Sequence, residues 1–248
     1  MIPHSTATRE QWLDARRDLL AAEKDLTHRA DEVARLRRQL PWVRVEKDYV
    51  FEGADGYISL ADLFGGRSQL IVQQFMLAPG WEAGCKSCSY MADHTEGMLP
   101  HLAARDTAMV AISRAPLAEI ARFRRRMGWS FPWVSSNGND FNYDYGVSFT
   151  KDEIASGKIG YNFGKWPLVG EEWPGVSVFA KDESGQVFHT YSTYGRGVEV
   201  MMTTYRMLDL TPKGRDEHDG VYKMDWVRHH DKYEQQAAKT ASCCSGRA

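Results

Sequence analysis

Apolar residues recur at every seventh position through the first forty residues of the chain, which predicts one long helix. These positions are Trp12, Leu19, Leu26, Val33 and Leu40. The pair Thr8 and Gln11 fits a capping box at the start of the helix, and Pro41 is expected to end it. We expect this narrow apolar seam either to pack on the chain's own domain or to form a dimer with a second copy. Arg29 interrupts the seam, which argues against a long, continuous coiled coil.

Two almost continuous apolar runs predict strands that are covered on both faces. Residues 70–77 are apolar except for Gln73 and Gln74, and residues 108–113 form the second run. The other predicted strands are a hairpin with a short helix within residues 43–64, a short strand at 131–135, and a hairpin made of 176–180 and 186–191.

Helical segments alternate with these strands. Residues 85–102 follow the first buried strand, and Pro100 is expected to kink or split this helix. Residues 116–127 follow the second buried strand, with Pro116 in the first turn, and a third helix is expected at 198–207. The order of strand, helix, strand, helix and β-hairpin predicts an α/β protein, in which right-handed crossovers place helices on both faces of a central mixed sheet.

We divide the chain into three parts. Residues 1–41 form a helical arm, residues 42–233 form one α/β domain with an insertion at about 151–172, and residues 234–248 are expected to be a disordered tail. The N-terminus lacks the pattern of a secretion signal, and no apolar run approaches the ~18 residues of a membrane span. A net charge of -2 gives no field that would gather nucleic acid. We therefore expect a cytoplasmic protein that binds neither membrane nor nucleic acid.

The strongest chemical signal is Cys85-Lys86-Ser87-Cys88, in which two cysteines lie one helical turn apart at the start of a predicted helix. Such a pair either cycles through a disulfide or shares a metal ion. A structural zinc site needs four ligands, and the remaining cysteines, Cys243 and Cys244, are adjacent in the tail. The pattern therefore favours redox chemistry, with no metal expected. The tail cysteines are either inert or shuttle electrons to the main pair.

Six short segments of the chain are typical of one bacterial family. They are Leu40-Pro41-Trp42-Val43, Gly84-Cys85-Lys86-Ser87-Cys88-Ser89, Ser113-Arg114-Ala115-Pro116-Leu117, Phe131-Pro132-Trp133-Val134-Ser135-Ser136, His189-Thr190-Tyr191-Ser192-Thr193-Tyr194 and Leu208-Asp209-Leu210-Thr211-Pro212-Lys213-Gly214-Arg215. Over roughly residues 10–233 the chain resembles an uncharacterised family of predicted dithiol-disulfide oxidoreductases, domain of unknown function 899. The resemblance implies a thioredoxin-like fold with the long N-terminal helix and the insertion before the last hairpin as additions.

The resemblance also implies roles for residues around the cysteines. Cys85 is expected to attack a substrate disulfide and Cys88 to resolve the mixed disulfide that results. Pro174 precedes the last hairpin, where thioredoxin-like proteins place a cis-proline facing the thiols. It would close one side of a substrate groove, and the backbone groups of its neighbours would hold an extended substrate. Trp81 is expected to line the same groove.

The attacking thiol needs a stabilised thiolate. A free cysteine with a pKa near 8.5 is only about 3% thiolate at pH 7, and lowering its pKa to about 7 requires roughly 2 kcal/mol. A helix N-terminus supplies about 0.3 to 1 kcal/mol. We therefore expect hydrogen bonds from the N–H groups of the first turn, together with the charge of Lys86, to supply the remainder.

The chain departs from thioredoxin at two places near the thiols. Gly84 stands directly before Cys85, where an aromatic residue is usual, and residues 70–77 hold no carboxylate. Proton transfer for the second thiol is therefore unassigned. Asp93 and His94 are near enough in sequence to be candidates, although a solvated helix face explains them as well.

Other functions and other residues stay open at this point. The chain could be a non-catalytic binding protein on a thioredoxin fold, or a thiol peroxidase; an oxidoreductase would need a disulfide substrate and an electron donor, but no cofactor. The histidines do not have the spacing of metal ligands. The arginines at 122–126 fit a solvated helix face better than a phosphate site. The aromatic residues are expected to line either a substrate pocket or the core. The histidines and aromatic residues in question are His189, His229, His230, Trp129, Phe131, Trp133, Tyr191 and Tyr194.

Overall fold

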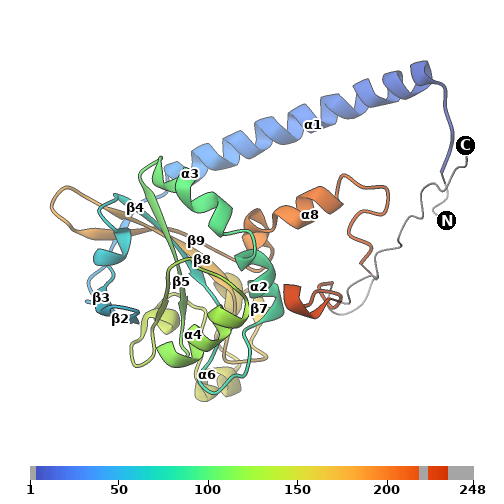
Figure 1. Ribbon diagram of the computed structural model, residues 1–248. Helices are drawn as coiled ribbons and strands as arrows, with labels where there is room; N and C mark the ends of the chain where they lie inside the picture. Colours follow the sequence, from blue (N-terminus) through green and yellow to red (C-terminus); the bar gives the residue numbers. More distant parts are fainter. Residues whose placement is uncertain (1–3, 218–222, 234–248) are drawn as a thin grey trace, which may run out of the picture.

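The computed structural model describes residues 4–217 and 223–233, and within them eight strands form one mixed sheet (Figure 1). The order across the sheet is β1-β9-β8-β4-β5-β6-β2-β3. The bounds of the strands are Val43–Arg44 (β1), Val50–Gly53 (β2), Gly56–Ser59 (β3), Gln69–Gln74 (β4), Thr107–Ser113 (β5), Trp133–Ser135 (β6), Gly175–Lys181 (β8) and Val187–Tyr194 (β9). A short strand, β7 (Trp166–Pro167), lies outside this sheet. The predicted α/β class is confirmed.

The centre of the sheet has the pairing of a thioredoxin-like fold. Strands β4, β5 and β6 run parallel to one another. Strand β8 runs antiparallel to both β4 and β9, so that the last hairpin lies beside the strand that leads to the cysteines. Strands β2 and β3 form the predicted early hairpin and extend the sheet beyond β6.

The apolar run in β4 is explained by packing on both faces of the sheet. Leu70 and Val72 point into one apolar cluster, which also contains Phe179 of β8. Ile71, between them, packs against the other cluster, which contains Cys88. Because successive side chains of a strand point to opposite faces, a strand covered on both sides buries nearly every position. The two buried polar residues of β4 form hydrogen bonds, since Gln73 donates to the Cys88 carbonyl and Gln74 donates to the Ser177 hydroxyl.

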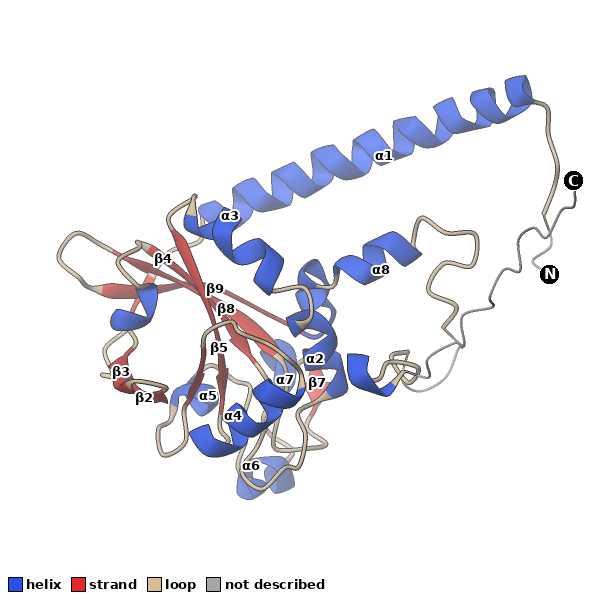
Figure 2. Ribbon diagram, viewed as in Figure 1, coloured by secondary structure: helices blue, strands red, loops and turns tan. Residues whose placement is uncertain are grey.

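Helices and short 3-10 turns surround the sheet (Figure 2). The α-helices are Arg9–Arg38 (α1), Lys86–Ala92 (α2), Leu99–Ala103 (α3), Leu117–Arg126 (α4), Phe141–Asp144 (α5), Lys151–Ser156 (α6), Tyr161–Gly164 (α7) and Thr203–Leu208 (α8); the 3-10 turns are Asp62–Phe64, Glu96–Met98, Gly195–Met201 and His230–Lys232. The helix predicted at 85–102 is split, but the break lies at residues 93–98, between α2 and α3, and Pro100 lies in the first turn of α3. The third predicted helix is instead a 3-10 turn followed by α8. In the described part of the chain, none of the helices has both the length and the apolar character needed to cross a membrane.

Helix α1 extends away from the domain (Figure 1). Its predicted start is confirmed, because the side chains of Thr8 and Gln11 form a capping box. Its apolar seam, however, is uncovered: Trp12, Leu19 and Leu26 are 49%, 54% and 69% exposed, and no residue of the helix is buried. The expectation that α1 packs on its own domain is therefore wrong, since only the C-terminal end of the helix comes close to the sheet.

We predict that α1 pairs with α1 of a second copy, because the seam has the heptad spacing of a coiled coil and the domain leaves it uncovered. Light scattering after size-exclusion chromatography is expected to give twice the mass of one chain. Leu19→Arg combined with Leu26→Arg is expected to give the monomer. The matched control, Ala21→Arg combined with His28→Arg, adds the same charges outside the seam and should leave the dimer intact. A monomeric wild-type chain would contradict the prediction.

Candidate active site

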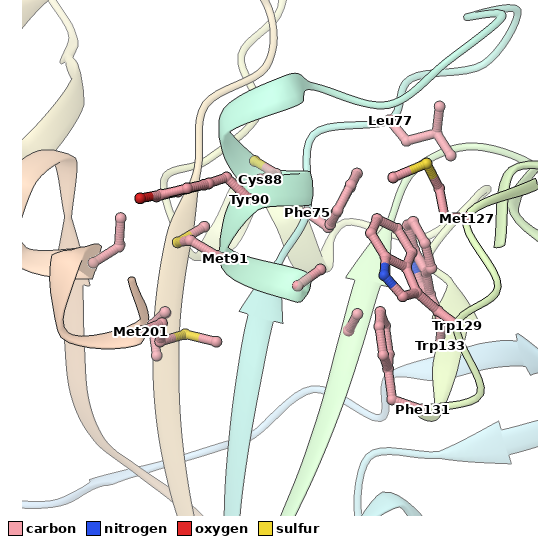
Figure 3. Packing of buried hydrophobic residues seen from close by; sticks show 14 of the residues in the cluster. Phe75, Leu77, Cys88, Tyr90, Met91, Met127, Trp129, Phe131, Trp133 and Met201 are labelled. Atoms are coloured by element: carbon pink, nitrogen blue, oxygen red, sulfur yellow. The ribbon is translucent and has the colours of Figure 1, made fainter. Parts of the chain in front are cut away.

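The two cysteines lie at the start of α2, just after β4. Cys85 is the N-cap residue of this helix, and its N–H donates to the Met76 carbonyl at 3.0 Å. Cys88 is one turn further along and is 0% exposed, in the apolar cluster that also holds Met91 (Figure 3). Both are free thiols, and Cys85 is partly exposed. The predicted position of the pair, at the start of a helix that follows a buried strand, is confirmed.

The two thiols have opposite protonation preferences. The pKa of Cys85 is lowered from its ordinary value of 9.0 to about 6. The largest cause is the Cys88 thiol, which donates a hydrogen bond to Cys85; the backbone N–H groups of Cys88 and Ser87 and the Ser87 hydroxyl add to this, while burial opposes it. Burial, followed by the Cys85 thiolate beside it, raises the pKa of Cys88 well above its ordinary value. The pair therefore offers one ionised, accessible sulfur and one buried, protonated sulfur.

Gly84 is required by the packing next to Cys85. A Cβ atom at this position would lie 2.5 Å from a ring carbon of Phe75 and 2.9 Å from a ring carbon of Phe123. The Gly84 carbonyl accepts a hydrogen bond from Nε2 of His229 at 2.8 Å. The aromatic residue usual before the first cysteine is therefore replaced by glycine because two buried rings already occupy its space.

The segment 223–233 binds α2 near the thiols. Nζ of Lys86 donates to the Asp225 carbonyl at 3.1 Å, so this ammonium is engaged by the C-terminal segment. The support that Lys86 is expected to give to the Cys85 thiolate stays a prediction.

Asp93 and His94, the two candidates for proton transfer, instead bind other segments of the chain. Asp93 accepts from the Trp129 indole at 2.9 Å and pairs with His230 at 2.6 Å. Nε2 of His94 lies 2.7 Å from the Thr204 hydroxyl of α8. Neither residue lines the cavity that contains the thiols. The structure therefore does not bring them to the cysteines.

Cys85 and Cys88 lie in a cavity of about 930 Å³. One wall comes from the insertion and the residues after it, and the opposite wall comes from the chain after β9. Trp81 and Pro174, both expected at a substrate groove, line it. The cavity is also lined by Met76, Met91, Tyr161, Trp166, Glu171, Glu172, Trp173, Arg196, Glu199, Tyr205, Asp209, Arg215, Glu217 and Lys223.

Pro174 differs from the expectation in its peptide geometry. The bond between Trp173 and Pro174 is trans, so the cis-proline implied by the resemblance is wrong. The backbone on either side is fixed by the chain itself: the Trp173 N–H donates to the Val147 carbonyl at 2.8 Å, and the Tyr161 hydroxyl donates to the Pro174 carbonyl. These bonds join the backbone around Pro174 to the insertion and to the segment before it.

Glu172 is a site residue that the sequence reasoning missed. Its side chain is 3% exposed, pairs with Arg114 and accepts from the Ser148 hydroxyl at 2.9 Å. Burial raises the pKa of Glu172 above its usual value, against the opposing effect of Arg114. Its charge is also one cause of the raised pKa of Cys88. In the sequence, Glu171 and Glu172 stand directly before Trp173-Pro174. No sequence pattern predicts that either of these two acidic residues is buried.

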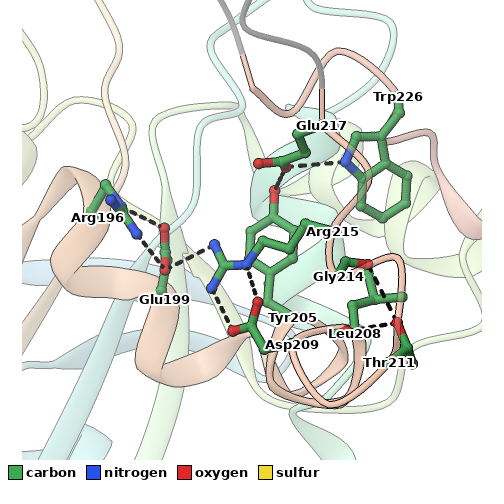
Figure 4. Close-up of polar contacts among 10 residues, drawn as sticks. All are labelled: Arg196, Glu199, Tyr205, Leu208, Asp209, Thr211, Gly214, Arg215, Glu217 and Trp226. Atoms are coloured by element: carbon green, nitrogen blue, oxygen red, sulfur yellow. Dashed lines mark hydrogen bonds and ion pairs between the residues drawn. The ribbon is translucent and has the colours of Figure 1, made fainter. Parts of the chain in front are cut away.

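The wall after β9 is held by a polar network (Figure 4). Arg215 is bidentate to Asp209, at 2.8 and 3.0 Å, and reaches Glu199 at 3.2 Å. The carboxylate of Glu217 accepts from the Tyr205 hydroxyl at 2.5 Å and from the Trp226 indole at 3.1 Å. These contacts connect Glu199, Tyr205 and Asp209 to Arg215, Glu217 and Trp226 along the cavity wall.

The remaining candidates belong mainly to the framework. Trp129, Phe131 and Trp133 are buried in the same apolar cluster as Cys88, which favours the core interpretation. His189 lies 2.7 Å from the Ser192 hydroxyl, and burial lowers its pKa. Within residues 4–217 and 223–233, no three or more His, Cys, Asp or Glu side chains are grouped to hold a metal ion. Cys243, Cys244 and the predicted tail lie outside the described residues.

Comparison with known proteins identifies the family. The model of a family described as "Bacterial protein of unknown function (DUF899)" matches residues 1–233. The chain belongs to this DUF899 family. The match confirms the resemblance that the six short segments between Leu40 and Arg215 indicate. A comparison with curated proteins gives no match.

Several solved structures are similar to this DUF899 protein. Peroxidoxin BcpB from Mycobacterium tuberculosis has 15% identity and a TM-score of 0.43, covering 68% of this chain and 96% of its own. A mutant of peroxiredoxin Q from Xanthomonas campestris has 11% identity and a TM-score of 0.45, covering 68% and 98%. A candidate protein disulfide isomerase from Bacteroides thetaiotaomicron has 18% identity and a TM-score of 0.38, covering 71% and 96%. At these scores the likenesses say nothing about activity, and the fold assignment rests on the pairing of the strands.

Proposed function

We propose that this DUF899 protein is a dithiol-disulfide oxidoreductase with Cys85 as nucleophile and Cys88 as resolving thiol. The observation that carries the proposal is the split in acidity of two thiols that share one cavity: the pKa of Cys85 is lowered to about 6, while that of Cys88 is raised. Thiol-disulfide exchange needs this asymmetry, because the attacking group is a thiolate and the second thiol must wait until the mixed disulfide has formed.

The reaction proceeds in two exchanges. The Cys85 thiolate bonds to one substrate sulfur, and the other substrate sulfur leaves as a thiolate. Cys88 loses its proton and attacks the sulfur of Cys85, which forms the Cys85–Cys88 disulfide and releases the second substrate thiolate. Two electrons pass from the protein to the substrate, and the reverse sequence oxidises a substrate dithiol. An external dithiol must then reduce the protein; its identity, like the cytoplasmic location, stays a prediction.

Glu172 is the group we assign to accept the proton of Cys88. Cys88 is buried and its pKa is raised, so it needs a base before it can attack. Glu172 lines the same cavity and has a raised pKa of its own, which brings its basicity closer to that of a thiol. The ion pair with Arg114 holds the carboxylate in place.

The pH dependence of alkylation tests the proposal. With iodoacetamide and peptide mapping, the rate at Cys85 is expected to rise with pH through a midpoint near 6, because thiolate rather than thiol reacts. At pH 7 about 90% of Cys85 would then be thiolate, against about 1% for a thiol of pKa 9.0. Cys88 is expected to stay unreactive over this range, since its pKa is raised and its side chain is buried.

The same experiment separates the competing functions. A Cys85 midpoint near the ordinary value would favour the non-catalytic binding protein. A low midpoint in a chain that consumes hydrogen peroxide and exchanges with no disulfide would favour the thiol peroxidase. Either result would overturn the proposal.

A further inference from the structure

The cavity over the thiols has two fastened walls. On the insertion side, the ring of Tyr161 stacks on Trp173 at 4.5 Å, and its hydroxyl accepts from the Gly195 N–H at 2.7 Å. This hydroxyl also bonds Pro174, so one buried tyrosine ties the insertion to both sides of the cavity. On the other side Arg215 ties Asp209 to Glu199. A substrate must therefore enter a cavity whose two walls are fixed by these contacts.

The backbone next to the thiols is not free to bind an extended chain. A peptide that docks like an added strand needs unpaired main-chain groups at the binding edge. Here the Trp173 N–H is used by Val147, Pro174 has no N–H, and its carbonyl is used by Tyr161. The next residue, Gly175, is paired in the sheet with Gln74 and Tyr194. These groups are already engaged within the chain, which disfavours the strand-like docking expected from the sequence.

The lining offers aromatic and sulfur-containing surface instead. Trp81 and Trp166 line the cavity and are 38% and 41% exposed, and Met76 and Met91 lie in the same lining. Side chains of these types bind apolar and aromatic groups by dispersion and by sulfur-aromatic contact. The volume of about 930 Å³ falls in the range of about 300–1,000 Å³ that small-molecule sites have.

The charges in the lining disfavour an anionic substrate. Arg196 and Arg215 both pair with Glu199, and Lys223 is exposed. Carboxylates outnumber cations among the lining residues, and Glu171 among them is half exposed. An anionic disulfide would therefore meet paired arginines and additional negative charge.

From this geometry we propose that the substrate is a low-molecular-weight, non-anionic disulfide with aromatic or other apolar substituents, and not a disulfide in a folded protein. The proposal rests on the proposed function and uses the same balanced exchange. Cys85 forms a mixed disulfide with one half of the molecule, Cys88 then closes the Cys85–Cys88 disulfide, and both halves leave as thiols.

Single-turnover reduction by the fully reduced full-length chain tests this. The substrates are dibenzyl disulfide, bis(2-hydroxyethyl) disulfide, oxidised glutathione and insulin. Each rate constant is divided by the rate constant for reduction of the same substrate by dithiothreitol. This normalisation removes differences in the intrinsic reactivity of the four disulfides. The normalised rate is expected to be at least about tenfold higher for dibenzyl disulfide than for bis(2-hydroxyethyl) disulfide, corresponding to the binding of an aromatic group. Oxidised glutathione and insulin are expected to be the slowest.

A matched pair of tryptophan variants locates the preference. Trp166→Ala removes an aromatic wall of the cavity and is expected to lower the preference at least about threefold. Trp42→Ala removes a tryptophan that is 56% exposed and outside the cavity, and is expected to leave the preference unchanged. Unchanged alkylation of Cys85 in both variants shows that the thiol site is still folded.

The outcomes distinguish this inference from the function on which it rests. Equal normalised rates for the two small disulfides, faster reduction of insulin than of dibenzyl disulfide, or a preference that Trp166→Ala leaves intact would overturn the substrate assignment while the oxidoreductase stands. A wild-type chain that reduces none of the four substrates would overturn the proposed function, and the substrate assignment with it.

Discussion

Cys85→Ser is expected to abolish the reduction of disulfides, because serine cannot form the mixed disulfide. Cys88→Ser is expected to react once and to stop at that intermediate, since the first attack needs only Cys85. Peptide mapping after mixing with bis(2-hydroxyethyl) disulfide, which separates the main pair from the tail cysteines Cys243 and Cys244, should show one half of the substrate on Cys85 in Cys88→Ser and an unmodified Cys88 in Cys85→Ser.

A second substitution at Cys88 tests why Cys85 is acidic. The Cys88 thiol is the largest cause of the lowered pKa of Cys85, and a serine hydroxyl can replace its hydrogen bond. Cys88→Ala removes the donor. A hydrogen bond to a charged group contributes about 1.5–3 kcal/mol, so the pKa of Cys85 is expected to rise by about 1 to 2 units in Cys88→Ala and much less in Cys88→Ser.

Retained disulfide turnover in Cys85→Ser would contradict the assignment of Cys85 as the nucleophile.

Glu172→Gln is expected to slow the resolving step by about 100-fold while leaving the first attack unchanged, since general-base assistance typically contributes at least this factor. The mixed disulfide with Cys85 should then accumulate in the variant, and acid quenching followed by mass spectrometry would detect it. In the wild type, the resolving rate should fall as the pH is lowered through the pKa of Glu172, which burial raises above its usual value. Below that pH the protonated carboxyl cannot accept the proton of Cys88.

Glu171→Gln is the matched control for this prediction. Glu171 also lines the cavity and lies 4.0 Å from Arg114, but its side chain is 44% exposed, against 3% for Glu172. It should leave the resolving rate unchanged. If Glu172 only held Arg114 in place, its substitution would lower the thermal stability and slow both steps together, without accumulation of the intermediate.

The sequence was sufficient for features that depend on local patterns. The start of α1 at Thr8, the buried strand β4, the position of Pro100 in a first helical turn and the placement of Cys85 at a helix start all follow from short-range rules of capping, periodicity and proline geometry. The last hairpin was predictable for the same reason. These elements bring the two cysteines and Pro174 together.

Features that depend on contacts between distant segments were not predictable in this way. Glu172 lines the same cavity as Cys88, and it is held there by contacts with Arg114 and Ser148, which lie 58 and 24 residues earlier in the chain. The backbone around Pro174 likewise depends on distant contacts, because the Trp173 N–H donates to the Val147 carbonyl and the Tyr161 hydroxyl donates to the Pro174 carbonyl. Whether the seam of α1 is covered depends on packing that no local pattern encodes.

The most direct test of the central claim is to mix the reduced wild-type chain with excess bis(2-hydroxyethyl) disulfide in the absence of any other reductant. Alkylation and peptide mapping then report Cys85, Cys88 and the tail cysteines separately. The main pair is expected to transfer two electrons, seen as a Cys85–Cys88 disulfide and the release of both substrate halves as thiols. Recovery of Cys85 and Cys88 as alkylated free thiols, with no substrate thiol released, would contradict it.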